Sequence, residues 1–527
     1  MALDQLTESY LETRWHIDPV DGSGTGRVTC DGRLGTFDED GLRQYVAALR
    51  AIAGAVEGLE VTSLEDEIDR TALLNEIRVT EHRYRVERPH RWDPGLWVGH
   101  VLEGLYQLLM LPGREPAELA QASADRLADV PRFLGDAEET LTDCPLPLVH
   151  GAQDALRAGV GLIGDLETAF GGATEMAETL HAHADAARAA MEAFGAHLAG
   201  LAAAGGPEEP WGIGRAAFQF RLQYQHTLIA STEELLRYAA GLIEQTEHEL
   251  DVLARALGAA RWPDALERLR AEAPTGSVVA VYQDVVARAR DHVRTQGLAT
   301  VPEGPLEVLT TPPHARPWIP IAAYLPPGAL SEDRTGRFFV TPPDGDGPPT
   351  RCRHEIATAV AHEGYPGHHL HFLTAHAQPR IVRRLLTAPI TVEGWALYAE
   401  QLMYETGFHT SPAEQFFNRV ALLWRALRIP LDIGLHTGTL TFDAAVRLLA
   451  ERLHAPTREA AAEVRRTYTE PAYQLAYAMG RRELLSLRDA YRRRTGADFT
   501  LGGFHAAVLT YGALPVSLVR WGLGVDA

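Results

Sequence analysis

The sequence contains no lysine, so all 49 of the basic residues among its 527 residues are arginines. A chain without lysine cannot form a Schiff base, and ordinary pyridoxal phosphate chemistry is therefore excluded. Basic residues are also outnumbered, because 70 acidic residues bring the net charge to −21. A protein that binds nucleic acid needs a basic surface, so we expect no nucleic acid partner.

Cysteine is scarce, and the three that occur lie far apart at Cys30, Cys144 and Cys352. An odd and scattered set argues against a disulfide framework and is typical of a reducing compartment. Cys352 lies shortly before a cluster of histidines, but it has no C-x-x-C companion. We therefore expect Cys352 to be a buried thiol and not a metal ligand.

Long hydrophobic runs are missing as well. No uninterrupted apolar run approaches the ~18 residues of a membrane-spanning helix. The N-terminus shows neither the basic nor the apolar region of a secretion signal. With hydrophobic residues at 46% and charged residues at 23%, the composition is that of a folded globular protein. We therefore expect a cytoplasmic enzyme without a membrane partner.

Apolar residues recur at helical spacing through most of the chain, and this pattern predicts a mainly α fold. Two segments rich in glycine or proline are the exceptions. Residues 18–35 contain several glycines and are predicted to form a loop or a short hairpin. Residues 301–349 carry strand signals at Leu306–Leu309 and Arg337–Thr341, and are predicted to contribute a small strand or hairpin element.

The most informative stretch is Ala361–His369, which reads AHEGYPGHH. A histidine followed by glutamate, with a second histidine nearby and a carboxylate on a later helix, is typical of a hydrolytic zinc site. We predict that His362 and His368 bind Zn²⁺. Glu363, directly after the first ligand, is the predicted general base.

The spacing of these histidines differs from the usual H-E-x-x-H, because Pro366 occupies the fourth position after His362. On a straight helix His362 and His368 would point roughly 120° apart. We therefore predict a kinked or bulged helix at Pro366-Gly367, where proline and glycine permit a break. His369 is the alternative ligand, but on a regular helix it would lie about 10 Å beyond His362.

The third ligand is predicted in the segment Glu393–Glu400, which reads EGWALYAE. Glu393 and Glu400 are seven residues apart, so they project from nearly the same helix face about two turns apart. Both cannot bind one ion on a regular helix. We assign Glu393 as the ligand and Glu400 as the partner that holds a histidine N–H in the right tautomer.

These motifs resemble those of a large bacterial family long catalogued as a domain of unknown function and regarded as zinc-metallopeptidase-like. Its signatures are similar to H-E-x-x-P-G-H-H and E-G-W-A-x-Y-x-E. The resemblance is strong over about residues 305–525 and includes the segments AAY (322–324), GRFFV (336–340), RIPLDIGLH (428–436), YAMG (477–480), LR (487–488), FH (504–505) and GALP (512–515). The members look like distant relatives of thimet oligopeptidase and carboxypeptidase Taq.

The resemblance implies a helical body with a deep cleft, a zinc ion and amide hydrolysis. We expect residues 1–300 to form one side of the cleft and residues 301–527 to be the metal-binding catalytic region, within one continuous helical fold. Because related peptidases use a tyrosine and a histidine from their C-terminal part to stabilise the oxyanion, Tyr477 and His505 are the candidates here.

Three further residues are predicted to bind substrate. Arg481 or Arg488 could hold a substrate carboxylate through two parallel hydrogen bonds, which would favour a carboxypeptidase or a dipeptide-sized substrate. The segment Phe338–Thr341, which contains Phe339, could be a strand edge that pairs with an extended substrate. A structural hairpin packed on helices is the alternative for this segment.

A long helix is predicted over Pro412–Leu440, with a kink at Pro430. Arg428, Asp432 and His436 recur every four residues along one of its faces. We expect Asp432 and His436 to support the metal-binding helices. The alternative is that His436 contacts the substrate.

The predicted function is therefore zinc-dependent hydrolysis of a peptide or amide bond, with a short peptide or small amide as substrate. Two alternatives stay open: a small-molecule amide hydrolase or tailoring enzyme on the same scaffold, and a non-haem iron enzyme that uses two histidines and one carboxylate. Glu363 beside His362 favours hydrolysis, since an oxygenase needs no such base. The sequence leaves the oligomeric state open, a homodimer included.

Overall fold

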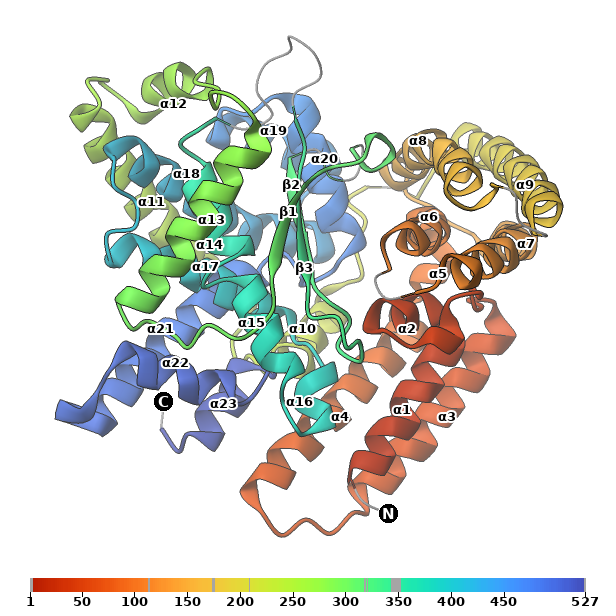
Figure 1. Cartoon of the computed structure of the whole chain (residues 1–527), viewed down its shortest axis with the longest axis horizontal. Helices are drawn as coiled ribbons and strands as arrows, with labels where there is room; N and C mark the ends of the chain where they lie inside the picture. The colour runs from red at the N-terminus through yellow and green to blue at the C-terminus, as the bar shows by residue number, and fades with distance from the viewer. Residues whose placement is uncertain are drawn as a thin grey trace. The chain divides into compact units, whose positions relative to one another are not determined.

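The computed structural model describes residues 3–111, 114–172, 176–207, 209–316, 319, 321–342 and 352–525. Within these ranges the protein is mainly helical with a small sheet, so the predicted fold class is confirmed (Figure 1). None of the described helices is long and apolar enough to cross a bilayer. Cys352 is a buried free thiol, as predicted.

Contacts between residues divide the chain into two compact units. The first consists of Met1–Val61, Leu73–Trp211 and Gly328–Asp333, and the second of Thr62–Ala72, Gly212–Pro327 and Arg334–Ala527. Every residue predicted for the metal site and its surroundings falls within the second unit. The division of roles between the two halves of the chain stays a prediction.

Amphipathic helices build the first unit, as their apolar spacing predicts. On α3, for example, Leu42, Tyr45 and Leu49 lie on one buried face. The elements of this unit are α1 (Leu3–Ile17), α2 (Pro19–Thr25), η1 (Val28–Cys30), α3 (Glu39–Glu57), η2 (Arg83–Glu87), α5 (Pro89–Trp92), α6 (Pro94–Met110), α7 (Pro116–Thr140), α8 (Leu146–Phe170) and α9 (Ala177–Ala204). Helix α4 (Leu64–His82) contributes residues to both units.

The glycine-rich segment 18–35 is not wholly the loop or hairpin that its composition predicts, because it begins with the seven-residue helix α2. The Asp18 carboxylate accepts the backbone N–H of Asp21 at 2.9 Å. Pro19 occupies the first helical position, where no amide donor is needed. These signals at the start of the helix outweigh the low helix propensity of the glycines that follow.

The second unit contains the predicted metal-binding helices. Its helical elements are α10 (Arg215–Tyr224), α11 (Thr232–Ala256), α12 (Trp262–Arg270), α13 (Val278–Thr295), η3 (Pro313–Ala315), α14 (Ile356–Glu363), α15 (His368–His376), α16 (Ile381–Leu385), α17 (Pro389–Glu405), α18 (Pro412–His436), α19 (Phe442–Leu453), α20 (Thr457–Thr469), α21 (Ala476–Thr495), η4 (Gly496–Asp498), α22 (Leu501–Leu509) and α23 (Val516–Gly522). Helix α14 packs against α13, α17 and α18, which surround it within this unit (Figure 1).

A three-stranded sheet is formed by β1 (Leu306–Thr310), β2 (Ala322–Leu325) and β3 (Gly336–Val340) in the order β1-β3-β2. β3 runs parallel to β1 and antiparallel to β2. The two strand signals in the sequence correspond to β1 and β3 and are confirmed. The prediction of a free edge at Phe338–Thr341 is wrong, because β2, which the sequence did not reveal, pairs with the second side of β3. Phe339 lies in this central strand and its side chain is buried.

Helices α17 and α21 approach each other closely at two glycines, Gly394 and Gly480. A Cβ atom placed on Gly394 would lie 2.5 Å from the Cα of Gly480, closer than real Cβ contacts occur. A Cβ on Gly480 would in turn collide with the carbonyl oxygen of Ile390. The two motifs that carry these glycines, EGWA and YAMG, are therefore packed backbone to backbone.

Candidate metal centre

The chain breaks between the two predicted histidine ligands. Helix α14 ends at Glu363, and α15 begins only at His368. A Cβ on Gly367 would collide with the carbonyl oxygens of Ala361 and His362, so the chain folds back directly against the last turn of α14. The sequence predicted one kinked or bulged helix; the structure instead has two helices, and this fold-back brings His368 beside His362.

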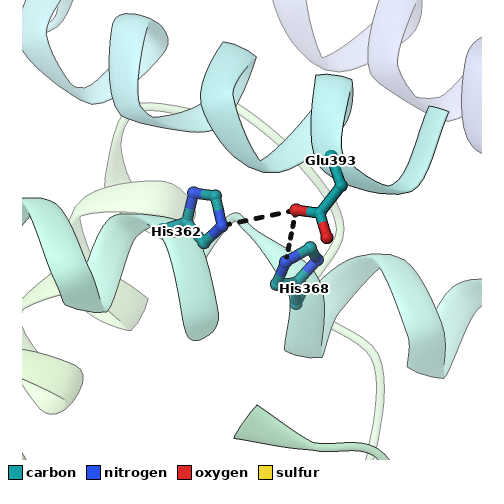
Figure 2. A group of neighbouring side chains, drawn as sticks. All are labelled: His362, His368 and Glu393. Carbon is teal, nitrogen blue, oxygen red and sulfur yellow. Dashed lines mark ion pairs between the residues drawn. The ribbon is translucent and has the colours of Figure 1, made fainter. Parts of the chain in front are cut away.

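Three donor atoms from α14, α15 and α17 converge in a buried cluster (Figure 2). Glu393 Oε2 lies 3.7 Å from His362 Nε2 and 3.4 Å from His368 Nε2. All three donor atoms lie within 4.8 Å of one another. Ligands at ~2.0–2.1 Å around a tetrahedral ion lie about 3.4 Å from each other. The two separations from Glu393 Oε2 are near this value, so the three residues could hold one metal ion.

The hydrogen bonding of the cluster also fits a cation. Glu393 Oε2 and His368 Nδ1 are both buried, and neither has a hydrogen-bond partner among the described residues. The two imidazoles compensate the charge on Oε2 as ion-pair partners, and a cation bound between the three groups would compensate it as well. The other oxygen, Glu393 Oε1, accepts the hydroxyl of Tyr473 at 2.6 Å, which leaves Oε2 for the two imidazoles.

Glu400 contacts the first histidine of the cluster. His362 Nδ1 donates to Glu400 Oε1 at 2.8 Å, which turns Nε2 of the same ring towards Glu393. Burial lowers the pKa of His362, but Glu393 and Glu400 outweigh it and raise that pKa to about 9. Burial likewise raises the pKa of Glu393, whereas the two imidazoles beside it lower that pKa well below its ordinary value.

The structure distinguishes between the two candidates for the second histidine. His369 points away from the cluster: its Nδ1 accepts the hydroxyl of Tyr324 at 3.0 Å, and its Nε2 lies 3.4 Å from the carbonyl oxygen of Gly304. Both of its ring nitrogens are therefore engaged elsewhere. His368 is the histidine that faces Glu393.

Glu363, the predicted general base, is the last residue of α14 and is partly exposed. No hydrogen bond or ion pair joins its carboxylate to another residue in the described part of the chain. Its proximity to His362 helps to raise the pKa of that histidine. A carboxylate beside the cluster, open to solvent and not engaged in a structural contact, is free to accept a proton.

Of the two candidate oxyanion donors, Tyr477 alone contacts the cluster. Its ring stacks on the imidazole of His362, with centroids 6.2 Å apart, and the guanidinium of Arg428 lies 4.4 Å from the ring centroid. Its hydroxyl makes no hydrogen bond with any described residue. His505, in contrast, is fully buried, and both its nitrogens are engaged: Nε2 with the Tyr398 hydroxyl at 2.8 Å and Nδ1 with the Leu298 carbonyl at 2.6 Å.

Asp432 and His436 lie on α18 without touching the three donor residues. The Asp432 carboxylate accepts the backbone N–H of Ala472 at 2.9 Å and that of Leu475 at 3.0 Å. His436 Nε2 donates to the carbonyl oxygen of Thr467 at 2.8 Å. Asp432 therefore holds the turn that precedes α21. The predicted support of the metal-binding helices by Asp432 and His436 stays a prediction.

The predicted substrate-binding arginines are engaged with protein groups. Arg481 donates to the side chain of Gln401 at 3.0 Å, and Arg488 forms an ion pair with Glu405 at 2.8 Å. The substrate-binding role of the two arginines stays a prediction. The role predicted for Phe339 depended on a free strand edge, and Phe339 is buried in the central strand β3.

Tyr473 is the residue that sequence reasoning missed. It lies four residues before Tyr477. It lies in the turn before α21, and its contact with Glu393 joins segments 80 residues apart, so no local pattern in the sequence indicates it.

The residues of the candidate metal centre lie within a stretch that matches a known protein family. A family-wide sequence profile, described as a bacterial protein of unknown function (DUF885), matches residues 19–522. The chain belongs to the DUF885 family. No curated protein matches it in sequence.

Two solved structures are similar to this DUF885 protein. One is a candidate lipoprotein of unknown function from Shewanella oneidensis, 20% identical, with a TM-score of 0.80 over 99% of this chain and 100% of the other. The second is a candidate lipoprotein from Colwellia psychrerythraea, 18% identical, with a TM-score of 0.84 over 99% and 98% of the two chains. At these identities the likeness shows a shared fold and nothing about activity.

Two buried histidines of the DUF885 protein give its stability a predictable dependence on pH. Burial lowers the pKa of His226 and of His505 to about 4. An unfolded histidine titrates near ~6.5, so the folded state resists a proton that the unfolded state takes up. Each contribution is therefore present above pH ~6.5 and is lost as the pH falls towards ~4, by about 3 kcal/mol per group.

We expect the free energy of unfolding in urea to fall between pH 7 and pH 4.5, and to fall less in a His505→Gln variant, which has no imidazole to protonate. Glutamine keeps a donor and an acceptor for the Leu298 and Tyr398 groups. An equal pH dependence in the variant and the wild type would contradict the assignment of His505 as a buried neutral histidine.

Proposed function

We propose that this DUF885 protein is a zinc-dependent hydrolase of peptide or amide bonds. The observation that carries the proposal is the buried group of His362, His368 and Glu393, whose donor atoms lie within 4.8 Å of one another beside the unengaged carboxylate of Glu363. Zinc bound by these three residues would polarise the scissile carbonyl and lower the pKa of a water. The resemblance of the motifs to zinc-metallopeptidase-like proteins supports the same reading.

Other residues would transfer the proton, orient a ligand and stabilise the oxyanion. Glu363 takes the proton of the attacking water and passes it to the leaving amine. Glu400 holds the N–H of His362, which keeps Nε2 of that ring available as a ligand. Tyr477 has an unengaged hydroxyl beside His362 and donates it to the oxyanion. His505 is not part of this proposal, because both its nitrogens are engaged.

Glu363 is the residue that favours hydrolysis over oxidation by a non-haem iron centre. The two reactions share the ligand set of two histidines and one carboxylate, but an oxygenase needs no proton acceptor next to the first ligand. We propose a short peptide or a small amide as substrate. The expected cytoplasmic location also stays a prediction; the two similar structures are described as candidate lipoproteins.

The decisive experiment measures metal content and peptide cleavage together. Purified wild-type protein is expected to carry about one zinc ion per chain and to cleave some members of a mixed peptide library, read by mass spectrometry. His368→Gln should lose the zinc and the cleavage. His369→Gln is the matched control, because His369 faces Tyr324 and Gly304, and it should keep the zinc.

Each outcome has a distinct meaning. Zinc with no cleaved peptide would favour a small-molecule amide as substrate. Iron in place of zinc, with oxygen consumption, would favour an oxygenase. Wild-type protein without bound metal would contradict the proposal.

A further inference from the structure

The carboxylate of Glu393 has two oxygens with different surroundings. Oε1 accepts the Tyr473 hydroxyl at 2.6 Å, whereas Oε2 faces the two imidazoles and has no other hydrogen-bond partner among the described residues. The terminal torsion of a glutamate side chain is broad and roughly two-fold, so an unrestrained carboxylate would exchange its two oxygens readily. The hydroxyl of Tyr473 therefore fixes which oxygen is available as a ligand.

Tyr473 is the donor in this contact. An ionised carboxylate only accepts hydrogen bonds, so the phenol hydroxyl donates to Glu393 Oε1. A charge-assisted O–H···O⁻ hydrogen bond of this length is among the stronger ones in proteins.

The turn that carries Tyr473 is itself held from several sides. The Asp432 carboxylate accepts the N–H groups of Ala472 and Leu475, and Ala472 has a φ of +62°, which is uncommon for a residue other than glycine. His226 Nε2 donates to the Ala472 carbonyl at 2.7 Å, and Arg221 donates to the Pro471 carbonyl at 3.3 Å. Side chains from α18 and from the α10 region thus enforce the backbone conformation that places the phenol.

We propose that Tyr473 is a positioning residue for the metal ligand Glu393, and that Asp432 acts through Tyr473 by holding its turn. The inference rests on the proposed function, and it assigns different roles to two neighbouring tyrosines. Tyr473 orients a ligand and so sets metal affinity. Tyr477, four residues later, keeps a free hydroxyl and so acts on the reaction and not on the metal.

The test is a comparison of Tyr473→Phe with Tyr477→Phe, two variants that each lose one hydroxyl from neighbouring rings, whose centroids lie 6.2 Å apart. Zinc dissociation constants are measured by competition with a chromophoric chelator, without reference to activity. Partners that orient a metal ligand typically contribute ~10–100-fold to affinity, so Tyr473→Phe should bind zinc about that much more weakly. Tyr477→Phe should bind zinc as the wild type does.

Two further readings complete the test. The visible spectrum of the cobalt-loaded protein should change in Tyr473→Phe, since the carboxylate is no longer held, and should be unchanged in Tyr477→Phe. Asp432→Asn keeps the shape of the carboxylate and should weaken zinc binding in the same direction; it decides the matter if Tyr473→Phe does not fold. Unchanged zinc affinity in a folded Tyr473→Phe would overturn this inference alone, whereas wild-type protein that binds no zinc would overturn the proposed function and this inference with it.

Discussion

Replacing Glu363 with glutamine is expected to lower the turnover number by about 10²–10⁴-fold and to leave zinc content unchanged. Glutamine has the size and shape of glutamate but cannot accept a proton. The carboxylate makes no hydrogen bond or ion pair with the described residues, so its removal breaks no structural contact. The measurement is turnover of a cleaved peptide alongside metal analysis of the same preparation.

The matched control for this variant is Glu451→Gln. Glu451 is exposed on α19, in the same unit of the chain and outside the candidate site. It should leave both turnover and zinc content at wild-type values. Undiminished turnover in Glu363→Gln would show that another group takes the proton, and loss of zinc from this variant would show that Glu363 supports the metal.

Replacing Gly394 with alanine is expected to damage both the fold and the site. The new methyl group would lie 2.5 Å from the Cα of Gly480, so α17 and α21 would have to separate. Overpacking of this kind typically costs about 1–3 kcal/mol of unfolding free energy. Glu393 is the adjacent residue on α17, and Tyr473 precedes α21, so the separation would also pull the carboxylate and the phenol apart. A displacement of ~1 Å can lower a reaction rate by about 10²-fold.

The control for this variant is Gly241→Ala on α11. A Cβ at this exposed helical position would meet no atom within 4 Å. Because alanine has the higher helix propensity, we expect an unfolding free energy unchanged or raised by up to about 1 kcal/mol. Urea unfolding and zinc affinity are measured for both variants. Wild-type stability and affinity in Gly394→Ala would show that the two helices adjust freely at this contact.

The helical character of the chain was readable from the sequence because it depends on local periodicity. The strands β1 and β3 were readable for the same reason, since their β-branched and aromatic runs are bounded by proline and glycine. β2 has only four residues, two of them alanine, and so gives little local signal. Its pairing with β3 is a contact between distant segments, which is why the predicted edge at Phe338–Thr341 was wrong.

For the candidate site, too, some residues could be identified from the sequence and others could not. His362, His368, Glu393, Glu363 and Glu400 were identified from spacing, since short motifs on neighbouring helices constrain which side chains can share a face. The oxyanion candidates came from the resemblance, and the arginines were proposed because a guanidinium can bind a carboxylate through two hydrogen bonds. In the structure Tyr477 stacks on His362. His505, Arg481 and Arg488 instead contact Tyr398, Gln401 and Glu405, respectively.

By itself, then, the sequence determined the mainly helical class and the residues able to bind a metal, because both follow from side-chain chemistry at short spacing along the chain. Only the tertiary structure decided that His368 and not His369 faces Glu393. The chain is not helical between α14 and α15, at residues 364–367, so regular helical spacing does not give the orientation of the histidines that follow. The tertiary structure also decided the partnership of Tyr473 with Glu393, 80 residues apart in sequence. The contact between Tyr473 and Glu393 depends on how closely α17 and α21 pack. Gly394 and Gly480 allow this close packing because neither has a Cβ atom, and only the tertiary structure shows that the two glycines face each other.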